Sequence, residues 1–237
     1  MSRAGLGITG ATVRYGDRVA VDDVSLDVAP ASTVAILGPS GCGKSSLLRA
    51  VAGLEALAAG RVEVDGRDLA AVPTYRRGVG LMFQEHALFA HLDVAGNVAF
   101  GLRMQNVPRR IRDARVAQML ELVGLADRGS ARIDELSGGE RQRVALARTL
   151  APEPAVVLLD EPLGSLDRVL RREMVAVLAD AFAATGATVL YVTHDQDEAF
   201  ALADRVAVMR HGRLSRVAVP DALLADPGDD WVADFLR

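Results

Sequence analysis

Short runs of alternating apolar and polar residues fill the first third of the chain and are separated by turn residues. Residues 6–15 and 19–28 have the period of two that indicates half-buried strands, whereas residues 33–37 are apolar throughout, as in a strand covered on both faces. Residues 44–53 have the spacing of a helix and end at a glycine, which commonly follows a helix. A strand, a glycine-rich loop and a helix are therefore predicted in that order. Two further strands are expected at residues 61–64 and 79–83.

The period changes in the middle of the chain, where helical patterns replace strand patterns between residues 88 and 150. Helices are expected at residues 110–123 and 140–150, and Pro152 and Pro154 end the second of them. This part of the chain is therefore predicted to be a mostly helical lobe.

Strand patterns return in the last third. Residues 155–159 and 188–193 are short apolar runs with helical segments between and after them, a pattern typical of a parallel sheet with helices on both faces. Residues 207–217 indicate a hairpin that turns at His211 and Gly212. The predicted fold class is therefore α/β, with a helical tail that contains Trp231 and Phe235.

Composition narrows the class of protein. The chain has 237 residues, half of them hydrophobic, which is enough for one large core or two small lobes and excludes a disordered or fibrous protein. Its net charge is −4, so no general attraction to nucleic acid or to anionic lipid is expected. Nucleic acid is therefore not expected to be a partner.

The location of the protein is predicted from cysteine usage and from the lengths of the apolar runs. Cys42 is the only cysteine, which excludes an internal disulfide and fits a reducing compartment such as the cytoplasm. No apolar run reaches the roughly 18 to 20 residues that cross a bilayer, and the first ten residues lack the apolar region of a signal peptide. Any membrane role is expected to be peripheral.

Residues 38–45 read GPSGCGKS and lie between a buried strand and a helix, where a phosphate-binding loop is expected. Glycines 38, 41 and 43 let successive backbone N–H groups face one anion, and the helix adds the positive end of its dipole. A turn that matches the pattern by chance does not explain why strand, loop and helix occur together.

Lys44 is the only lysine among 27 basic residues, so its position is expected to need an ammonium group specifically. It is predicted to contact the β- and γ-phosphates, and the Ser45 hydroxyl is predicted to ligate Mg²⁺. Cys42 is assigned no chemistry, although its thiol is expected to lie against the bound phosphates. The predicted loop contacts are Gly38, Pro39, Ser40, Gly41, Cys42, Gly43, Lys44, Ser45 and Ser46.

Two adjacent carboxylates, Asp160 and Glu161, follow the buried strand predicted at residues 155–159. Strand alternation predicts that they point in opposite directions, so they do not share one metal ion. Asp160 is assigned to Mg²⁺, and Glu161 is assigned as the general base for an attacking water. Without the phosphate-binding loop, both residues could instead cap the next segment.

A second helix start, LSGGE, has the features of an anion-binding site. Ser137 is a good N-cap, and Gly138 and Gly139 leave backbone N–H groups unshielded. A capping box explains Ser137 and Glu140 without any ligand. Two glycines cost a helix about 1 kcal/mol each relative to alanine, so close approach of a ligand would justify them.

These motifs, in this order and spacing, resemble those of the nucleotide-binding subunits of ATP-binding cassette (ABC) transporters, most closely of importers. The resemblance covers residues 6–236. It implies a P-loop NTPase (RecA-like) core with an N-terminal antiparallel β subdomain and an inserted helical subdomain. The core would comprise residues 1–87 and 151–237, and the helical subdomain residues 88–150.

The resemblance also implies a head-to-tail dimer in which the phosphate loop of one copy and LSGGE of the other enclose the same ATP. Tyr15 would stack on adenine, Gln84 would contact Mg²⁺ and water, and His194 would contact the γ-phosphate. Each has a plainer alternative: Tyr15 as a strand aromatic, Gln84 as a strand end, and His194 as a helix cap. The residues expected to act in trans are Ser137, Gly138, Gly139, Glu140 and Asp167.

One segment departs from the family pattern. After Pro162 the chain reads LGSLD, where the family commonly has a small-residue stretch similar to SALD. Gly164 is expected to loosen communication between the two sites, whereas Asp167 is retained.

The predicted function is ATP binding and Mg²⁺-dependent hydrolysis that drive substrate uptake through separate transmembrane permease subunits. The permease is expected to dock near Gln84 to Leu92, with a substrate-binding protein acting indirectly, on the inner face of the cell membrane. The subgroup that the chain resembles imports ferric iron, thiamine, polyamines, sulfate or sugars. The alternative is a soluble ABC-type ATPase such as one for iron–sulfur assembly. A small-molecule kinase does not explain LSGGE.

Overall fold

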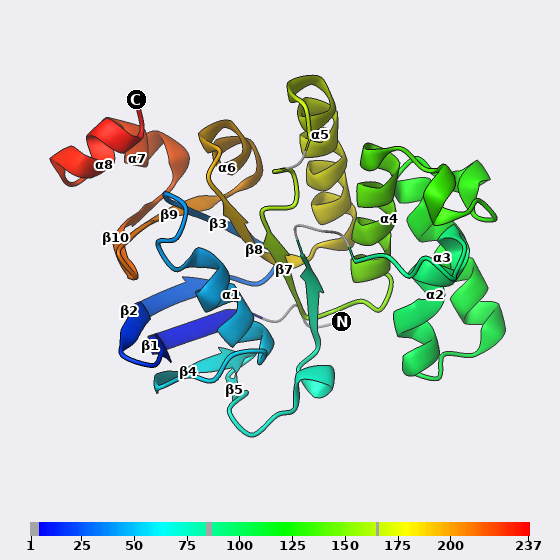
Figure 1. The fold of residues 1–237 in the computed structure, drawn as a ribbon, viewed down its shortest axis with the longest axis horizontal. Coiled ribbons are helices and arrows are strands. Elements are labelled where there is room, and N and C mark those ends of the chain that lie inside the picture. The colour runs from blue at the N-terminus through cyan, green and yellow to red at the C-terminus, as the bar shows by residue number, and fades with distance from the viewer. Residues whose placement is uncertain (1–4, 84–86, 165) are drawn as a thin grey trace.

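The computed structural model describes residues 5–83, 87–164 and 166–237, which form two sheets with helices between and around them (Figure 1). The first sheet is antiparallel and has the strand order β2-β1-β4-β5. It is drawn in blue to cyan in Figure 1, because most of it comes from the first third of the chain. Its strands are β1 (Leu6–Tyr15), β2 (Arg18–Val28), β4 (Ala59–Val64) and β5 (Arg67–Asp68).

The second sheet has the strand order β10-β9-β3-β8-β7-β6. All its strand pairs are parallel except the pair of β10 with β9. Every residue of β3, β7 and β8 is buried, as the uninterrupted apolar runs predict for strands covered on both faces. The strands are β3 (Thr33–Leu37), β6 (Val79–Met82), β7 (Val156–Asp160), β8 (Thr188–Thr193), β9 (Arg205–Arg210) and β10 (Arg213–Ala218).

Helix α1 (Lys44–Ala52) packs between the two sheets. Its apolar residues Leu47, Leu48 and Val51 are fully buried in a cluster that also contains Ile8 of β1 and Ile36 of β3. The helix ends at Gly53, which adopts a left-handed conformation, as the sequence predicts. The phosphate-binding loop is therefore anchored on both sides by buried elements.

The remaining helices are α2 (Val94–Met104), α3 (Arg109–Leu122), α4 (Gly138–Leu150), α5 (Arg168–Thr185), α6 (Gln196–Leu202), α7 (Pro220–Ala225) and α8 (Asp230–Phe235). Of these, α2, α3 and α4 form a lobe to one side of the parallel-rich sheet, α5 and α6 lie over the sheet, and α7 and α8 lie near β9 and β10, far from the lobe (Figure 1). The predicted division at residues 87 and 151 stays a prediction, and one continuous apolar cluster joins the lobe to the sheet. Three short 3₁₀ turns lie at Thr74–Arg76, Ala126–Arg128 and Ile133–Glu135. Within the described ranges, no helix combines the length and the hydropathy that crossing a membrane requires.

The structure confirms the predicted α/β class and most element types, with boundaries that differ by one or two residues. The helix predicted from residue 140 begins at Gly138, because Ser137 caps it. The strand predicted at residues 155–159 ends at Asp160 instead.

Gly101 of α2 offers a test of how tightly the lobe packs. A β-carbon at this position would lie 2.5 Å from Cγ of the rigid Pro152 ring. Glycine to alanine normally stabilises a helix by about 1 kcal/mol. We expect Gly101→Ala instead to lower the free energy of unfolding by about 1–3 kcal/mol through overpacking, as measured by denaturant titration.

A double-mutant cycle provides the control. In a Pro152→Ala background the ring is gone, so Gly101→Ala should be neutral or stabilising. Equal effects of Gly101→Ala in both backgrounds would contradict the packing explanation.

Candidate functional site

A cavity of about 220 Å³ lies over the loop between β3 and α1. Loop residues, the end of β1 and the residue after β7 line it together, although they are far apart in the sequence. The lining residues are Tyr15, Arg18, Ala20, Ser40, Gly41, Gly43, Lys44, Ser45, Ser46 and Glu161.

Close backbone contacts set the shape of the loop. A β-carbon on Gly38 would collide with the carbonyl of Met209, and one on Gly43, whose φ is +110°, would collide with the carbonyl of Ala20. The hairpin turn also holds the loop, because the Gly212 N–H donates to the Cys42 carbonyl at 2.9 Å. Sequence reasoning found this turn but not its contact with the loop.

Lys44 is almost completely buried at the start of α1. Its Nζ donates to the carbonyl oxygens of Gly38 at 2.7 Å and Pro39 at 3.0 Å, and it lies 3.8 Å from Glu161 Oε1. A buried ammonium needs such partners. The loop therefore folds around the positive charge predicted to meet the phosphates.

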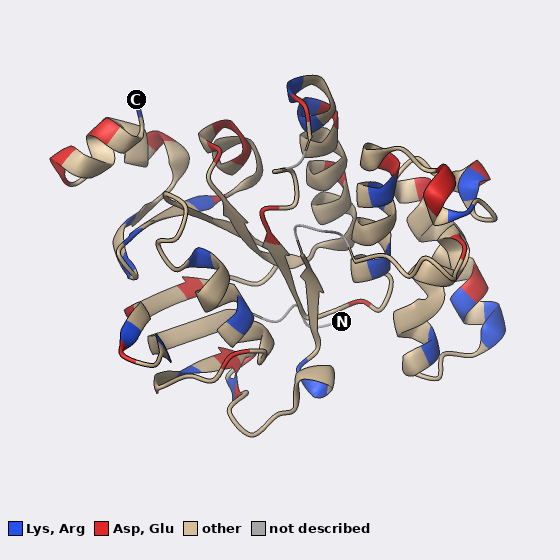
Figure 2. Ribbon diagram, in the orientation of Figure 1, with Lys and Arg blue, Asp and Glu red and all other residues tan. Residues whose placement is uncertain are grey.

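Ser45 and Asp160 form an oxygen-rich pair where β7 ends, and the neighbouring strands β3, β6 and β8 carry no charged residue (Figure 2). Ser45 Oγ donates to Asp160 Oδ1 at 2.7 Å. Burial raises the pKa of Asp160, and the Ser45 hydrogen bond opposes that rise.

This donor set fits Mg²⁺, which takes one or two protein oxygens and completes its shell with phosphate and water. The described part of the chain contains no cluster of three or more His, Cys, Asp or Glu side chains suited to a metal ion. Gln84, the other predicted metal contact, lies outside the described residues.

Glu161 lies beyond the end of β7, so the strand alternation used to predict its direction does not apply. Its φ is +44°, a left-handed conformation that is costly for a residue with a β-carbon, and its N–H donates to the Val192 carbonyl. This turn places Glu161 Oε2 3.1 Å from Nδ1 of His194. Asp160 and Glu161 do face different partners, but the turn rather than the pleat causes the difference.

Tyr15 lies at the rim of the cavity with 43% of its surface exposed. Its hydroxyl donates to Ser46 Oγ at 3.4 Å. The ring is therefore available beside the loop, and its predicted stacking on adenine stays a prediction.

The Cys42 thiol does not lie where it was expected. Cys42 is only 7% exposed, belongs to the apolar cluster between the sheets, and is absent from the described residues that line the phosphate cavity. Burial raises the pKa of its thiol. It instead borders a second pocket, on the Arg210 and Trp231 side of the loop.

The capping box at the start of α4 is present. Ser137 Oγ accepts from the Glu140 N–H at 3.3 Å, and Glu140 Oε2 accepts from the Ser137 N–H at 2.9 Å. Asp167 caps α5 in a similar way, because its Oδ1 accepts from the N–H groups of Val169 and Leu170. These three side chains have structural roles within their own chain.

The two glycines that follow Ser137 have different surroundings. A β-carbon on Gly139 would lie 2.8 Å from the Leu170 side chain of α5, so a larger residue there would force that side chain to shift. A β-carbon on Gly138 would meet nothing within 4 Å. Contact with Leu170 is therefore a second reason for a glycine at position 139, and the interpretation that both glycines serve a ligand stays a prediction.

The two predicted anion-binding segments do not share a cavity. Among the residues described, none of Ser137 to Glu140 lines the space over the phosphate loop. In Figure 1, α1 and α4 lie on opposite sides of β7. The start of α4 is thus left for a ligand that the phosphate loop of the same chain does not hold.

Sequence reasoning missed Arg171, which joins three segments of the site. Its guanidinium lies 3.0 Å from Asp195 and 3.5 Å from Glu198, and it donates to the Leu166 carbonyl at 3.1 Å. The start of α5 is thereby tied to the segment that follows His194. No sequence signal indicates this role, because the ionic partners lie more than twenty residues away.

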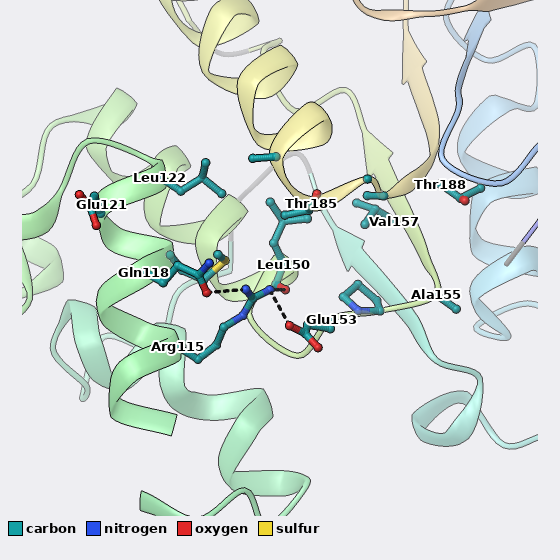
Figure 3. Close-up of a pocket in the computed structure, with 15 residues that line it drawn as sticks. Arg115, Gln118, Glu121, Leu122, Leu150, Glu153, Ala155, Val157, Thr185 and Thr188 are labelled. Atoms are coloured by element: carbon teal, nitrogen blue, oxygen red, sulfur yellow. Dashed lines mark hydrogen bonds and ion pairs between the residues drawn. The ribbon is translucent and has the colours of Figure 1, made fainter. Parts of the chain in front are cut away.

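A larger cavity, about 730 Å³, lies elsewhere, between α3 and the connection from α5 to β8 (Figure 3). Its Arg115 already donates to Gln118 and to the Leu150 carbonyl and pairs with Glu153. The cavity borders the start of β7, whereas Asp160 ends that strand. Chemistry rather than size therefore identifies the candidate site.

Comparisons with known proteins agree with this site. The sequence profile of the family described as ABC transporter matches residues 21–164, which include the phosphate loop, the LSGGE segment and both carboxylates. The chain therefore belongs to the ABC transporter family.

Three curated relatives cover nearly all of this chain. The "Fe(3+) ions import ATP-binding protein FbpC" of Streptomyces coelicolor is 57% identical over 98% of the chain and 66% of the relative, and that of Streptomyces avermitilis is 55% identical over 98% and 67%. The "Spermidine/putrescine import ATP-binding protein PotA" of Rubrobacter xylanophilus is 49% identical over 95% and 60%. The chain thus spans about two thirds or less of the lengths of these relatives.

Glu198 offers a test of the buried hydrogen-bond network that its carboxylate forms with the Tyr191 and Thr193 hydroxyls. It is 3% exposed, accepts from the Tyr191 and Thr193 hydroxyls, and faces Arg171 and Asp195. Burial raises its pKa above the usual 4.5. The folded state therefore holds a proton that the unfolded state releases, and stability falls as pH rises from about 4.5 through the raised pKa.

We expect Glu198→Gln to remove this component of the pH dependence. The melting temperature of the parent minus that of the variant should decrease as pH rises from about 4.5 to 8, measured by scanning calorimetry. Glu173→Gln, at an exposed position of α5, is the matched control and should show no such decrease. A difference for Glu198→Gln that stays flat or grows would contradict the prediction.

Proposed function

We propose that this chain binds and hydrolyses ATP and that the hydrolysis drives import through separate membrane subunits. The observation that carries the proposal is one cavity lined by Lys44, Ser45 and Glu161, with Asp160 hydrogen-bonded to Ser45 and His194 to Glu161. Phosphoryl transfer to water needs positioning and charge stabilisation, and these groups supply both.

Each residue has a defined task in this proposal. Lys44 exchanges its contacts with the loop carbonyls for the β- and γ-phosphates. Ser45 and Asp160 hold Mg²⁺, which neutralises phosphate charge when bound. Glu161 accepts a proton from the attacking water, and His194 holds the Glu161 carboxylate through its Nδ1 and contacts the γ-phosphate through the rest of its ring.

The start of α4 does not line the cavity over the phosphate loop of its own chain, which supports a head-to-tail dimer in which a second copy completes each site. Charge-assisted hydrogen bonds from the Ser137 hydroxyl and the Gly138 amide to a γ-phosphate would contribute about 1.5–3 kcal/mol each. ADP lacks the group that accepts them. One such bond at each of two sites approaches the roughly 5.5 kcal/mol that switches a population between open and closed states.

The permease contact is proposed for the segment up to Leu92, of which residues 87–92 are described. Asn97 of α2 fastens this segment, because its side chain accepts from the Phe89 N–H at 2.8 Å and donates to the Phe89 carbonyl at 3.1 Å. Arg148 of α4 donates to the Ala87 carbonyl at 2.7 Å. A surface shaped in advance by these hydrogen bonds suits docking to a membrane subunit at the inner face of the membrane.

The names of the relatives support the import interpretation over iron–sulfur assembly, because all three are import ATP-binding proteins. They name Fe³⁺ and polyamines as cargo. We propose a cargo of this kind, delivered by a substrate-binding protein that does not contact this chain directly.

Two substitutions separate nucleotide binding from hydrolysis. Lys44→Ala removes the buried ammonium, so ATP affinity should fall by about a hundredfold or more, as measured by equilibrium binding. Glu161→Gln keeps the shape of the side chain but removes the base, so ATP binding should persist while turnover falls about a hundredfold and an ATP-bound dimer accumulates. Turnover of Glu161→Gln at the parental rate would disprove the base assignment.

Asn97→Ala tests the docking segment. It removes the bonds to Phe89, so co-purification with the membrane subunits from detergent should fall about tenfold or more, since two buried hydrogen bonds are lost. ATP binding by the isolated chain reports on folding and should change less than threefold. Asn106→Ala, at an exposed left-handed position, is the matched control and should keep co-purification. Unchanged co-purification of Asn97→Ala would contradict the assignment.

A further inference from the structure

Gln142 of α4 is completely buried, and its amide crosses from the helical lobe to the site. Its Nε2 donates to the carbonyl of Pro162 at 2.6 Å. Pro162 directly follows Glu161 in the sequence. One side chain of the lobe therefore donates a hydrogen bond to the backbone next to the proposed catalytic carboxylate.

The turn that carries Glu161 needs contacts from other segments to hold its conformation. Glu161 has a positive φ, a conformation that persists only where the surroundings hold it. On one side its N–H is bonded to the Val192 carbonyl, and on the other the Gly164 N–H donates to its carbonyl at 3.2 Å. The Gln142 bond to Pro162 is a third restraint on this turn, and it comes from a different element.

Packing alone does not account for a glutamine here. Its second amide atom, Oε1, is buried and has no hydrogen-bond partner among the residues described. A half-satisfied buried amide is less favourable than an apolar side chain of the same size, such as methionine. The amide is therefore better explained by what its single donated bond positions.

Helix α4 connects this bond to the second anion-binding segment. Ser137 and Gly138 lie at the first turn of α4, and Gln142 follows on the next turn, about 6–8 Å further along the axis. Leu170 packs against Gly139 of that first turn, and Arg115 binds the carbonyls of Leu150 and Ala151 at the far end, beside the cavity in Figure 3. The helix is thus held along its length.

We propose that Gln142 is a positioning residue that holds the Glu161 turn, so that engagement of the start of α4 by nucleotide adjusts the catalytic carboxylate of the same chain. The proposal rests on the proposed function and deepens it. It assigns to the lobe a mechanical link to hydrolysis that runs through one buried hydrogen bond.

The first test replaces the amide with an apolar side chain of similar size. In the full chain, Gln142→Met should lower kcat for ATP hydrolysis about tenfold or more, with KM within about threefold, because the base is misplaced while the nucleotide contacts remain. Gln105→Met is the matched control. Its amide also donates to a proline carbonyl, that of Pro152 at 3.4 Å, but at an exposed position, and its kcat should stay parental.

The second test uses a readout that a merely structural role would not change. In Gln142→Glu, the protonated carboxyl can donate to the Pro162 carbonyl, whereas the carboxylate repels it, and burial keeps the proton on to a higher pH than usual. The kcat of this variant relative to the parent should therefore fall about tenfold or more between pH 5.5 and 8.5. This test remains available if Gln142→Met fails to fold.

The outcomes are distinct. Parental kcat in Gln142→Met, a loss that appears only in KM, or a pH-independent ratio for Gln142→Glu would overturn the proposal while ATP hydrolysis by the parent still upholds the proposed function. A parent without ATPase activity, or parental turnover in Glu161→Gln, would overturn the proposed function and this inference together.

Discussion

The burial of one ammonium group is the constraint on which the rest of the site depends. Lys44 is 4% exposed, so its charge has to be balanced by the carbonyls of Gly38 and Pro39 and by the nearby Glu161 carboxylate. These contacts fold the loop over the N-terminal end of α1. The same closure brings the residue after β7 to within 4 Å of the loop lysine. A phosphate that replaces these carbonyls as the partner of the Lys44 ammonium would therefore bind to side chains that are already in place.

Strands β2 and β9 and the turn between β9 and β10 also support the loop. The turn between β9 and β10 donates to the Cys42 carbonyl, and the backbones of β2 and β9 approach so closely that Gly38 and Gly43 admit no β-carbon. Packing within the chain is thus sufficient to require these two glycines. Gly139 of α4 also packs closely, against the Leu170 side chain.

Helix α4 connects the two functional ends of the molecule. Its first turn presents the exposed Gly138 and the capping Ser137, while Gln142 reaches the turn that carries Glu161. The large cavity beside Arg115 separates α3 from the connection between α5 and β8 (Figure 3). Helix α4 therefore joins the lobe to the turn after β7, whereas the cavity borders the start of that strand.

The sequence by itself determined the element types, the family and the phosphate loop, because periodicity, glycine spacing and the order of motifs are local and repetitive signals. It placed Asp160 at a strand end and Ser137 in a capping box. Three features became evident from the folded chain alone: Glu161 leaves the strand in a left-handed turn, the Cys42 thiol is buried between the sheets, and Leu170 packs against Gly139. The roles of Arg171 and Gln142 were also recognised only in the structure. Arg171 contacts Leu166, Asp195 and Glu198, and Gln142 donates a hydrogen bond to Pro162. The physical reason is that each of these features depends on atoms about twenty or more residues away, whose approach follows from packing and leaves no pattern in the local sequence.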